Sequence, residues 1–84
     1  MDEQKNQELQ ELLQTLAEAL VDDAEAIQIK PSLEDETIVL ELHVAPEDMG
    51  RVIGKGGRRA QAIRSIMKAK ASRLNCRVAV NIVD

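Results

Sequence analysis

Two segments of the sequence, residues 37–44 and 76–83, place an apolar side chain at every second position, which is the pattern of strands with one buried face. The stretch between them, residues 45–75, has its apolar residues at helical spacing instead. A connection that leaves one strand and returns through helices to a parallel strand of the same sheet is nearly always right-handed. We therefore expect the two strands to be parallel neighbours, with the helices on one face of the sheet.

The first part of the sequence predicts one helix and one more strand. A helix over about residues 4–22 is indicated by apolar residues spaced three and four apart, namely Leu9, Leu12, Leu13, Leu16, Leu20 and Val21. This stripe is under two heptads long, which is too short for a coiled coil, so we expect the helix to pack on a sheet. A strand over residues 26–30 is ended by Pro31, and a polar connection over residues 31–36 leads into the strand at 37–44. The predicted fold class is α+β, with a mixed three-stranded sheet covered on one face by helices.

The region between the two parallel strands predicts two helices separated by glycines. Pro46, followed by two carboxylates, is typical of a helix start, and a short helix is expected to about Ile53. Three glycines in the four positions Gly54–Gly57 are incompatible with a continuing helix. A longer helix from Arg58 to about Asn75 carries apolar residues on one side and most of the basic residues on the other.

The composition limits both the core and the function. A chain of 84 residues with 44% hydrophobic and 31% charged residues is typical of one folded domain. It has no Phe, Tyr or Trp, so the core must be aliphatic and bases have no aromatic platform on which to stack. The single cysteine, Cys76, excludes an internal disulfide and a zinc cluster of cysteines. No segment approaches the roughly 18 apolar residues of a membrane span, and the acidic first residues are unlike a signal peptide, so we expect a cytoplasmic protein.

Acidic and basic residues are segregated along the chain. Residues 1–48 contain 14 acidic and two basic residues, a net charge of −12, whereas residues 49–84 contain nine basic residues and one acidic residue, a net charge of +8. A half this basic favours a polyanionic partner. The alternative is that the acidic half neutralises it within the fold, and charge alone does not separate the two.

The glycines that precede the second helix have the properties of a phosphate-binding site. Glycine leaves the backbone unobstructed, and free N–H groups at a helix N-terminus carry a partial positive charge, to which Lys55, Arg58 and Arg59 add full charges. A Walker A loop is excluded, because three residues rather than four separate Gly50 from Gly54 and no hydroxyl residue follows Lys55. A dinucleotide fingerprint is excluded because the preceding residues are helical. The alternative is a purely structural turn between helices, for which one glycine would suffice.

The segment Val52-Ile53-Gly54-Lys55-Gly56-Gly57 resembles the VIGxxG signature of KH domains, and the predicted order of elements matches their type II arrangement. The resemblance extends over essentially the whole chain, residues 1–84. Among KH proteins, the chain resembles the small bacterial single-KH proteins of the KhpA family. The sequence departs from the KH pattern at Ala60, where an isoleucine is common, and Ile63 one turn later can supply that bulk.

This resemblance implies that the glycine turn (Gly54–Gly57) holds the phosphates of about four nucleotides of single-stranded RNA. The bases would lie over an aliphatic groove formed by Val52, Ile53, Ile63 and the edge of the second strand. The connection over residues 31–36 would be the family's variable loop, whose acidic residues would repel RNA. The residues implied to contact RNA are Arg51, Val52, Ile53, Gly54, Lys55, Gly56, Gly57, Arg58, Arg59, Ile63 and Arg64.

The resemblance also implies a biological role. It implies a homodimer, or a heterodimer with a larger KH protein of the KhpB type, acting as an RNA chaperone or post-transcriptional regulator in cell elongation and cell-wall homeostasis. The alternative function is a protein-interaction adaptor that uses the KH fold for assembly and contacts RNA only incidentally, which the acidic first half favours.

No residue pattern predicts catalysis or a cofactor. His43 is the only histidine, has no cysteine nearby, and falls on the outward side of its strand beside Glu41, so neither a metal site nor a nucleophile pair is expected. Cys76 falls on the inward side of the last strand and is expected to be a buried structural thiol. Met49 and Met67 fall on apolar helix faces and are expected in the core.

Overall fold

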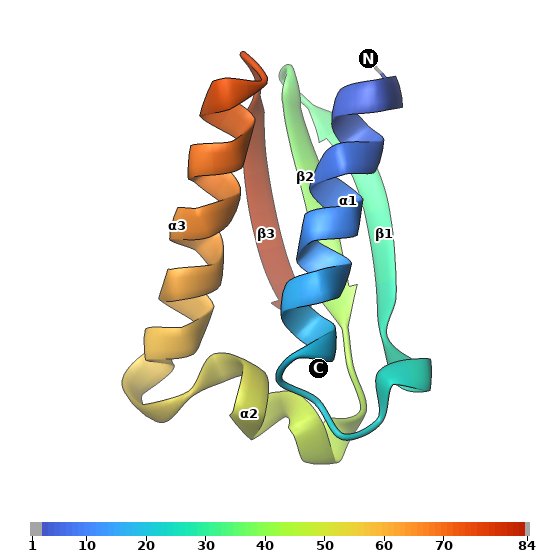
Figure 1. Cartoon of the computed structure of the whole chain (residues 1–84), viewed down its shortest axis with the longest axis vertical. Helices are drawn as coiled ribbons and strands as arrows, with labels where there is room; N and C mark the ends of the chain where they lie inside the picture. The colour runs from blue at the N-terminus through green and yellow to red at the C-terminus, as the bar shows by residue number, and fades with distance from the viewer. Residues whose placement is uncertain (1–2, 84) are drawn as a thin grey trace.

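The computed structural model describes residues 3–83. The helices are α1 (Glu3–Glu18), α2 (Met49–Ile53) and α3 (Arg58–Arg73), and the strands are β1 (Gln28–Glu34), β2 (Thr37–His43) and β3 (Arg77–Val83). Three short 3-10 turns, η1 (Ala24–Ala26), η2 (Pro46–Asp48) and η3 (Lys55–Gly57), lie in the connections. Helices α1 and α3 lie side by side on one face of the sheet, and α2 crosses below them (Figure 1). The predicted α+β class and element order are confirmed.

The sheet is mixed, as the alternation predicts. Its strand order is β1-β2-β3, with β1 antiparallel and β3 parallel to β2. Ile38 lies opposite Val78 and Leu40 opposite Val80, so the apolar positions of both strands share one face. Because β2 is the central strand, it has no free edge, and the prediction that its edge lines an RNA groove is wrong. The edge strand that packs beside α3 is β3.

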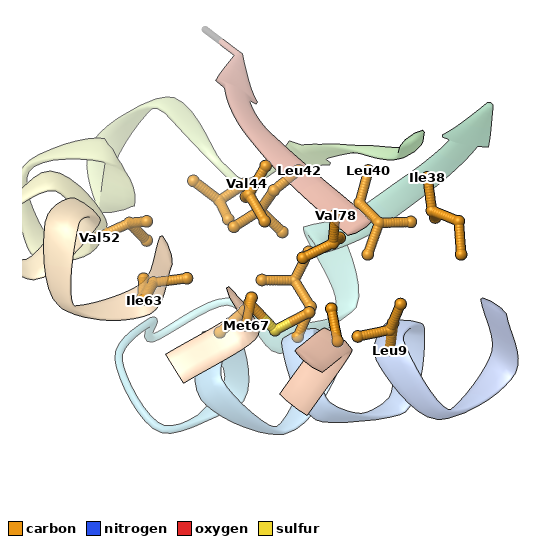
Figure 2. Close-up of a cluster of buried hydrophobic side chains, with 13 residues drawn as sticks. Leu9, Ile38, Leu40, Leu42, Val44, Val52, Ile63, Met67 and Val78 are labelled. Atoms are coloured by element: carbon orange, nitrogen blue, oxygen red, sulfur yellow. The ribbon is translucent and has the colours of Figure 1, made fainter. Parts of the chain in front are cut away.

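The core lies between the two long helices and the sheet, and it is entirely aliphatic apart from methionine sulfur. Helix α1 contributes Leu9, Leu13 and Ala17, spaced four residues apart on one face. Met67 of α3 is fully buried as expected and lies in the same cluster as Leu40 and Leu42 of the sheet (Figure 2). Met49 is only partly buried and packs against this cluster.

Three expected boundaries are wrong. Helix α1 ends at Glu18, before its predicted end at residue 22. Strand β1 continues through Pro31 to Glu34, because it is an edge strand, where a missing N–H need not interrupt pairing. The predicted connection over residues 31–36 is therefore only a two-residue turn, Asp35 and Glu36, with φ values of 48° and 65°.

Two single residues also refine the expectations. Cys76 precedes β3 and is half-buried against the core, so the prediction of a buried thiol on the inward face of β3 is wrong in position and in degree. His43 alternates with the buried Leu42, and its Nε2 lies 3.0 Å from Oε1 of Glu41. The side-by-side placement of these two residues is the predicted one.

Candidate nucleic-acid interface

The glycine turn joins the end of α2 to the start of α3. All three of its glycines have positive φ, 75° at Gly54, 65° at Gly56 and 76° at Gly57, a region that side chains with a Cβ rarely adopt. The Gly57 N–H donates to the Gly54 carbonyl at 3.1 Å, which closes the turn. Within residues 3–83, no side chain caps the N-terminus of α3. The Arg58 N–H, the first of α3, donates to the Lys55 carbonyl, and no described side chain accepts from the amides that follow it in the first turn.

Space around the turn differs between its two ends. A Cβ placed on Gly54 would lie 2.8 Å from Cβ of Arg59 and 3.0 Å from its backbone nitrogen, so Gly54 permits a close approach of α2 to α3. A Cβ on Gly56 or Gly57 meets no atom within 4 Å in the described part of the chain. The outer surface of the turn is therefore open to a ligand.

The basic residues near the turn form two groups. The side chains of Lys55 and Arg58 are exposed and have no hydrogen-bond or ion-pair partner among residues 3–83. In contrast, Arg51 and Arg59 bind other parts of the protein, with Arg59 Nη1 donating to the Arg51 carbonyl at 2.8 Å. Arg64 also has an internal partner, because its Nε donates to the Val80 carbonyl at 3.2 Å. The predicted basic cluster is present, but only part of it is free.

A groove runs between α3 and the edge strand β3. It has a volume of about 180 Å³ and is lined by Arg64, Lys68, Val78, Ala79 and Val80. Lys68 and Arg77 also line the adjoining hollow near the end of α3, and neither was predicted as a site residue. For Lys68 the signal in the sequence was helical phase, since Arg64 and Lys68 are four residues apart and so share one flank of α3.

The aliphatic residues predicted to contact bases are mostly internal. Val52 is fully buried and Ile63 is 3% exposed, because both belong to the core cluster. Figure 2 shows both side chains as part of this cluster, and because they are buried, the prediction that they line an open groove is wrong. Ile53 is 37% exposed and is the member of the predicted aliphatic set that reaches the surface beside the glycine turn.

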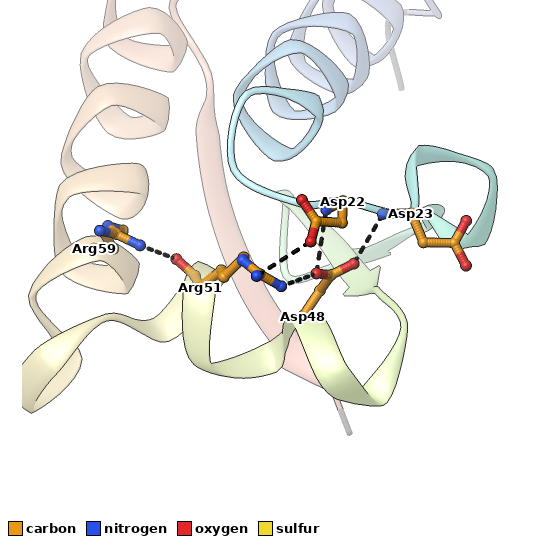
Figure 3. Close-up of polar contacts among 5 residues, drawn as sticks. All are labelled: Asp22, Asp23, Asp48, Arg51 and Arg59. Carbon is orange, nitrogen blue, oxygen red and sulfur yellow. Dashed lines mark hydrogen bonds and ion pairs between the residues drawn. The ribbon is translucent and has the colours of Figure 1, made fainter.

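A buried carboxylate lies at the other end of α2. Asp48 is fully buried, and it accepts hydrogen bonds from the backbone N–H groups of Asp22 at 3.2 Å and Asp23 at 3.1 Å and from Arg51 Nη1 at 2.8 Å (Figure 3). Arg51 Nη2 also pairs with Asp22 Oδ2 at 3.1 Å. The backbone hydrogen bonds from Asp23 and Asp22 lower the pKa of Asp48, with Arg51 acting in the same direction and burial opposing them.

Within residues 3–83, no group of three or more His, Cys, Asp or Glu side chains is arranged to hold a metal ion. No helix in the same range is long and apolar enough to cross a membrane.

The fold and the glycine turn together define a KH domain of type II. Comparison with known proteins shows the family to which this domain belongs. Residues 10–82 match the family model "KhpA/KhpB, KH domain". The "RNA-binding protein KhpA" of Clostridium acetobutylicum is 49% identical over 75 residues, covering 89% of this chain and all of that protein. The protein of the same name from Caldanaerobacter subterraneus subsp. tengcongensis is 51% identical over 73 residues, covering 87% of this chain and 97% of that protein. The chain therefore belongs to the KhpA/KhpB KH-domain family.

The fold is also found in a solved structure with little sequence similarity. An Era variant of Aquifex aeolicus bound to GDP·AlF4− superposes with a TM-score of 0.62 at 20% identity, over 88% of this chain and 29% of that chain. This likeness concerns the fold alone.

Proposed function

We propose that this protein binds single-stranded RNA without catalysing a reaction, and that the glycine turn holds the RNA phosphates. The observation that carries the proposal is the open outer surface of Gly56 and Gly57 beside the cationic side chains of Lys55 and Arg58, which have no partner among residues 3–83. Relatives that match nearly the full chain are named RNA-binding proteins, which agrees with this chemistry.

The mechanism follows from the backbone. Phosphate oxygens approach the turn because Gly56 and Gly57 have no side chains, and the amides that follow Arg58 in the first turn of α3, which have no side-chain cap, donate hydrogen bonds to them. The ammonium of Lys55 and the guanidinium of Arg58 add charge-assisted contacts. These contacts recognise the sugar-phosphate backbone and are independent of base identity.

The bases would extend from the turn along the groove between α3 and β3. Ile53 supplies apolar surface near the turn, and Lys68 supplies a further cation in the groove. Without aromatic side chains, base contacts are limited to van der Waals contacts and hydrogen bonds. One domain should therefore bind weakly and with little sequence selectivity.

Weak binding by one domain gives a reason for assembly. Two sites joined rigidly bind one RNA more tightly, because the second contact is intramolecular. We include in the proposal a homodimer or a complex with a larger KH protein of the KhpB type, acting in the cytoplasm as an RNA chaperone or post-transcriptional regulator that affects cell elongation and cell-wall homeostasis. The competing function is an adaptor that contacts proteins through its acidic surface.

The test is fluorescence polarisation with a labelled, mixed-sequence single-stranded RNA. The double variant Lys55→Asp, Gly56→Asp places two carboxylates where phosphates should lie, so we expect binding to be lost. Lys30→Glu is the control for overall charge, since Lys30 is exposed on β1 away from the turn, and it should bind nearly as well as the wild type. A folded double variant with wild-type affinity would exclude the turn as the RNA site and favour the adaptor.

A further inference from the structure

We propose that Arg51 and Arg59 are positioning residues that hold the glycine turn in its binding geometry through the buried Asp48, and that they are not phosphate ligands. This inference rests on the proposed function, because it assigns roles within the same RNA site. It divides the four cations nearest the turn into two phosphate-binding residues, Lys55 and Arg58, and two residues that bind other parts of the protein.

The guanidinium of Arg51 is paired within the protein. Its Nη1 lies 2.8 Å from Asp48 Oδ1 and its Nη2 lies 3.1 Å from Asp22 Oδ2. One guanidinium therefore faces two carboxylates, and the cluster has a net negative charge. The Asp22 side chain is 79% exposed, so a phosphate that approached Arg51 would meet this carboxylate as well. Such a cluster repels an anion.

Arg59 binds a carbonyl group at the end of α2. The last carbonyl groups of a helix have no partner within it. At the end of α2, the Gly54 N–H donates a hydrogen bond to the Gly50 carbonyl at 2.9 Å. The Arg51 carbonyl accepts a hydrogen bond from Arg59 Nη1, 2.8 Å away, and Arg59 belongs to the first turn of α3. Arg59 thus caps α2 from the far side of the glycine turn.

Arg59 also packs against the glycine turn. The Arg59 Cβ lies only 2.8 Å from where a Cβ on Gly54 would be, so the same residue that caps α2 also packs against the first glycine. The contacts form one continuous series from the backbone of Asp22 and Asp23 through Asp48 and Arg51 to Arg59 (Figure 3). This series joins the loop after α1 to the start of α3, and it fixes the two ends of the turn relative to each other.

The experiment compares salt dependence across charge-removing variants. A lost phosphate contact reduces the slope of log affinity against log salt by about 0.7 for single strands. We expect this reduction for Lys55→Gln and for Arg58→Gln. For Arg51→Gln and Arg59→Gln we expect the wild-type slope with weaker binding, about tenfold if the turn keeps its binding geometry only about a tenth of the time.

A conservative variant separates charge from geometry. Arg51→Lys keeps the positive charge but loses the planar fork that bridges Asp48 and Asp22. A positioning role predicts that Arg51→Lys binds as weakly as Arg51→Gln, whereas a phosphate contact predicts recovery of slope and affinity. A slope reduced by about 0.7 in Arg51→Gln or Arg59→Gln, or recovery in Arg51→Lys, would overturn the inference.

A second measurement needs no RNA. In the wild type and in Arg59→Gln, two-dimensional amide NMR would report the Gly54, Gly56 and Gly57 resonances. We expect the Gly54 and Gly56 resonances to shift in Arg59→Gln and to remain unchanged in Arg58→Gln, whereas Gly57, the sequence neighbour of Arg58, is not a control in that variant. Unchanged glycine resonances in Arg59→Gln would contradict the positioning role. If the wild type failed to bind RNA while these shifts occurred, the proposed function would be wrong and the positioning role would stand.

Discussion

Replacing Gly54 with alanine should destabilise the protein far more than the same replacement elsewhere in the turn. Gly54 has φ 75° and ψ 172°, a conformation almost confined to glycine, and forcing another residue into it costs about 1–3 kcal/mol. The added Cβ would also lie 2.8 Å from Arg59 Cβ and 3.0 Å from its backbone nitrogen, which cannot move without shifting α3. Overpacking of this kind costs about 1–3 kcal/mol. We expect the free energy of unfolding to fall by about 2–6 kcal/mol in total.

Two other glycines supply matched controls. Gly56→Ala meets the conformational cost of positive φ, about 1–2 kcal/mol, but no atom lies within 4 Å of its Cβ among the described residues. Gly50→Ala lies inside α2, is exposed, and has no described neighbour within 4 Å of its Cβ, so it should stabilise the protein by about 0.5–1 kcal/mol. The expected order of stability is Gly50→Ala, wild type, Gly56→Ala, Gly54→Ala.

The assay is urea denaturation followed by far-UV circular dichroism, because a chain without aromatic residues gives no useful intrinsic fluorescence. Linear extrapolation yields the free energy of unfolding for each variant, and an unchanged m-value would show that each unfolds in the same way. If Gly54→Ala were no less stable than Gly56→Ala, the close approach of Arg59 to the turn would be wrong.

Three further predictions concern acid stability, the core and assembly. Because its folded pKa is lowered, ionised Asp48 stabilises the fold above its ordinary pKa, and this contribution is lost as the pH falls through the lowered value. In urea titrations from about pH 6 to pH 2, the free energy of unfolding of Asp48→Asn should therefore depend less on pH than that of the wild type, and an equal dependence would refute the assignment. Leu13→Ala should lower the free energy of unfolding by about 2–5 kcal/mol, whereas Leu33→Ala, at a residue 48% exposed, should cost under about 1 kcal/mol; equal losses by circular dichroism would contradict the burial pattern. Sedimentation equilibrium should show a dimer at micromolar concentration, since so small an aliphatic core is marginal alone, and a stable 9.3 kDa monomer at high concentration would argue against assembly.

The element order and the buried faces were predictable because they depend on local periodicity. Alternation in β2 and β3 placed Leu40 and Val80 on the same face, and the helical crossover between them required a parallel pair. Element ends were less predictable. Local propensity alone predicts that Pro31 ends the strand, but an edge position lets β1 continue to Glu34.

The glycine turn was predictable in the same way. Three glycines within Gly54–Gly57 break any helix, and all three adopt the positive φ that only glycine adopts readily. The free cations Lys55 and Arg58 lie beside this turn because they are its neighbours in sequence. Local sequence thus determined where the candidate site lies.

The sequence by itself determined the fold class, the aliphatic core and the position of the turn, since each depends on patterns within a few residues. Only the tertiary structure decided which side chains of the site are available. Asp22 and Asp48 are 26 residues apart in the chain, and their approach commits Arg51 to internal contacts. Likewise, Val52 and Ile63 became core residues when α2 and α3 packed together. A basic or apolar residue acquires its role from the neighbours it meets, and those contacts between distant segments exist only once the chain has folded.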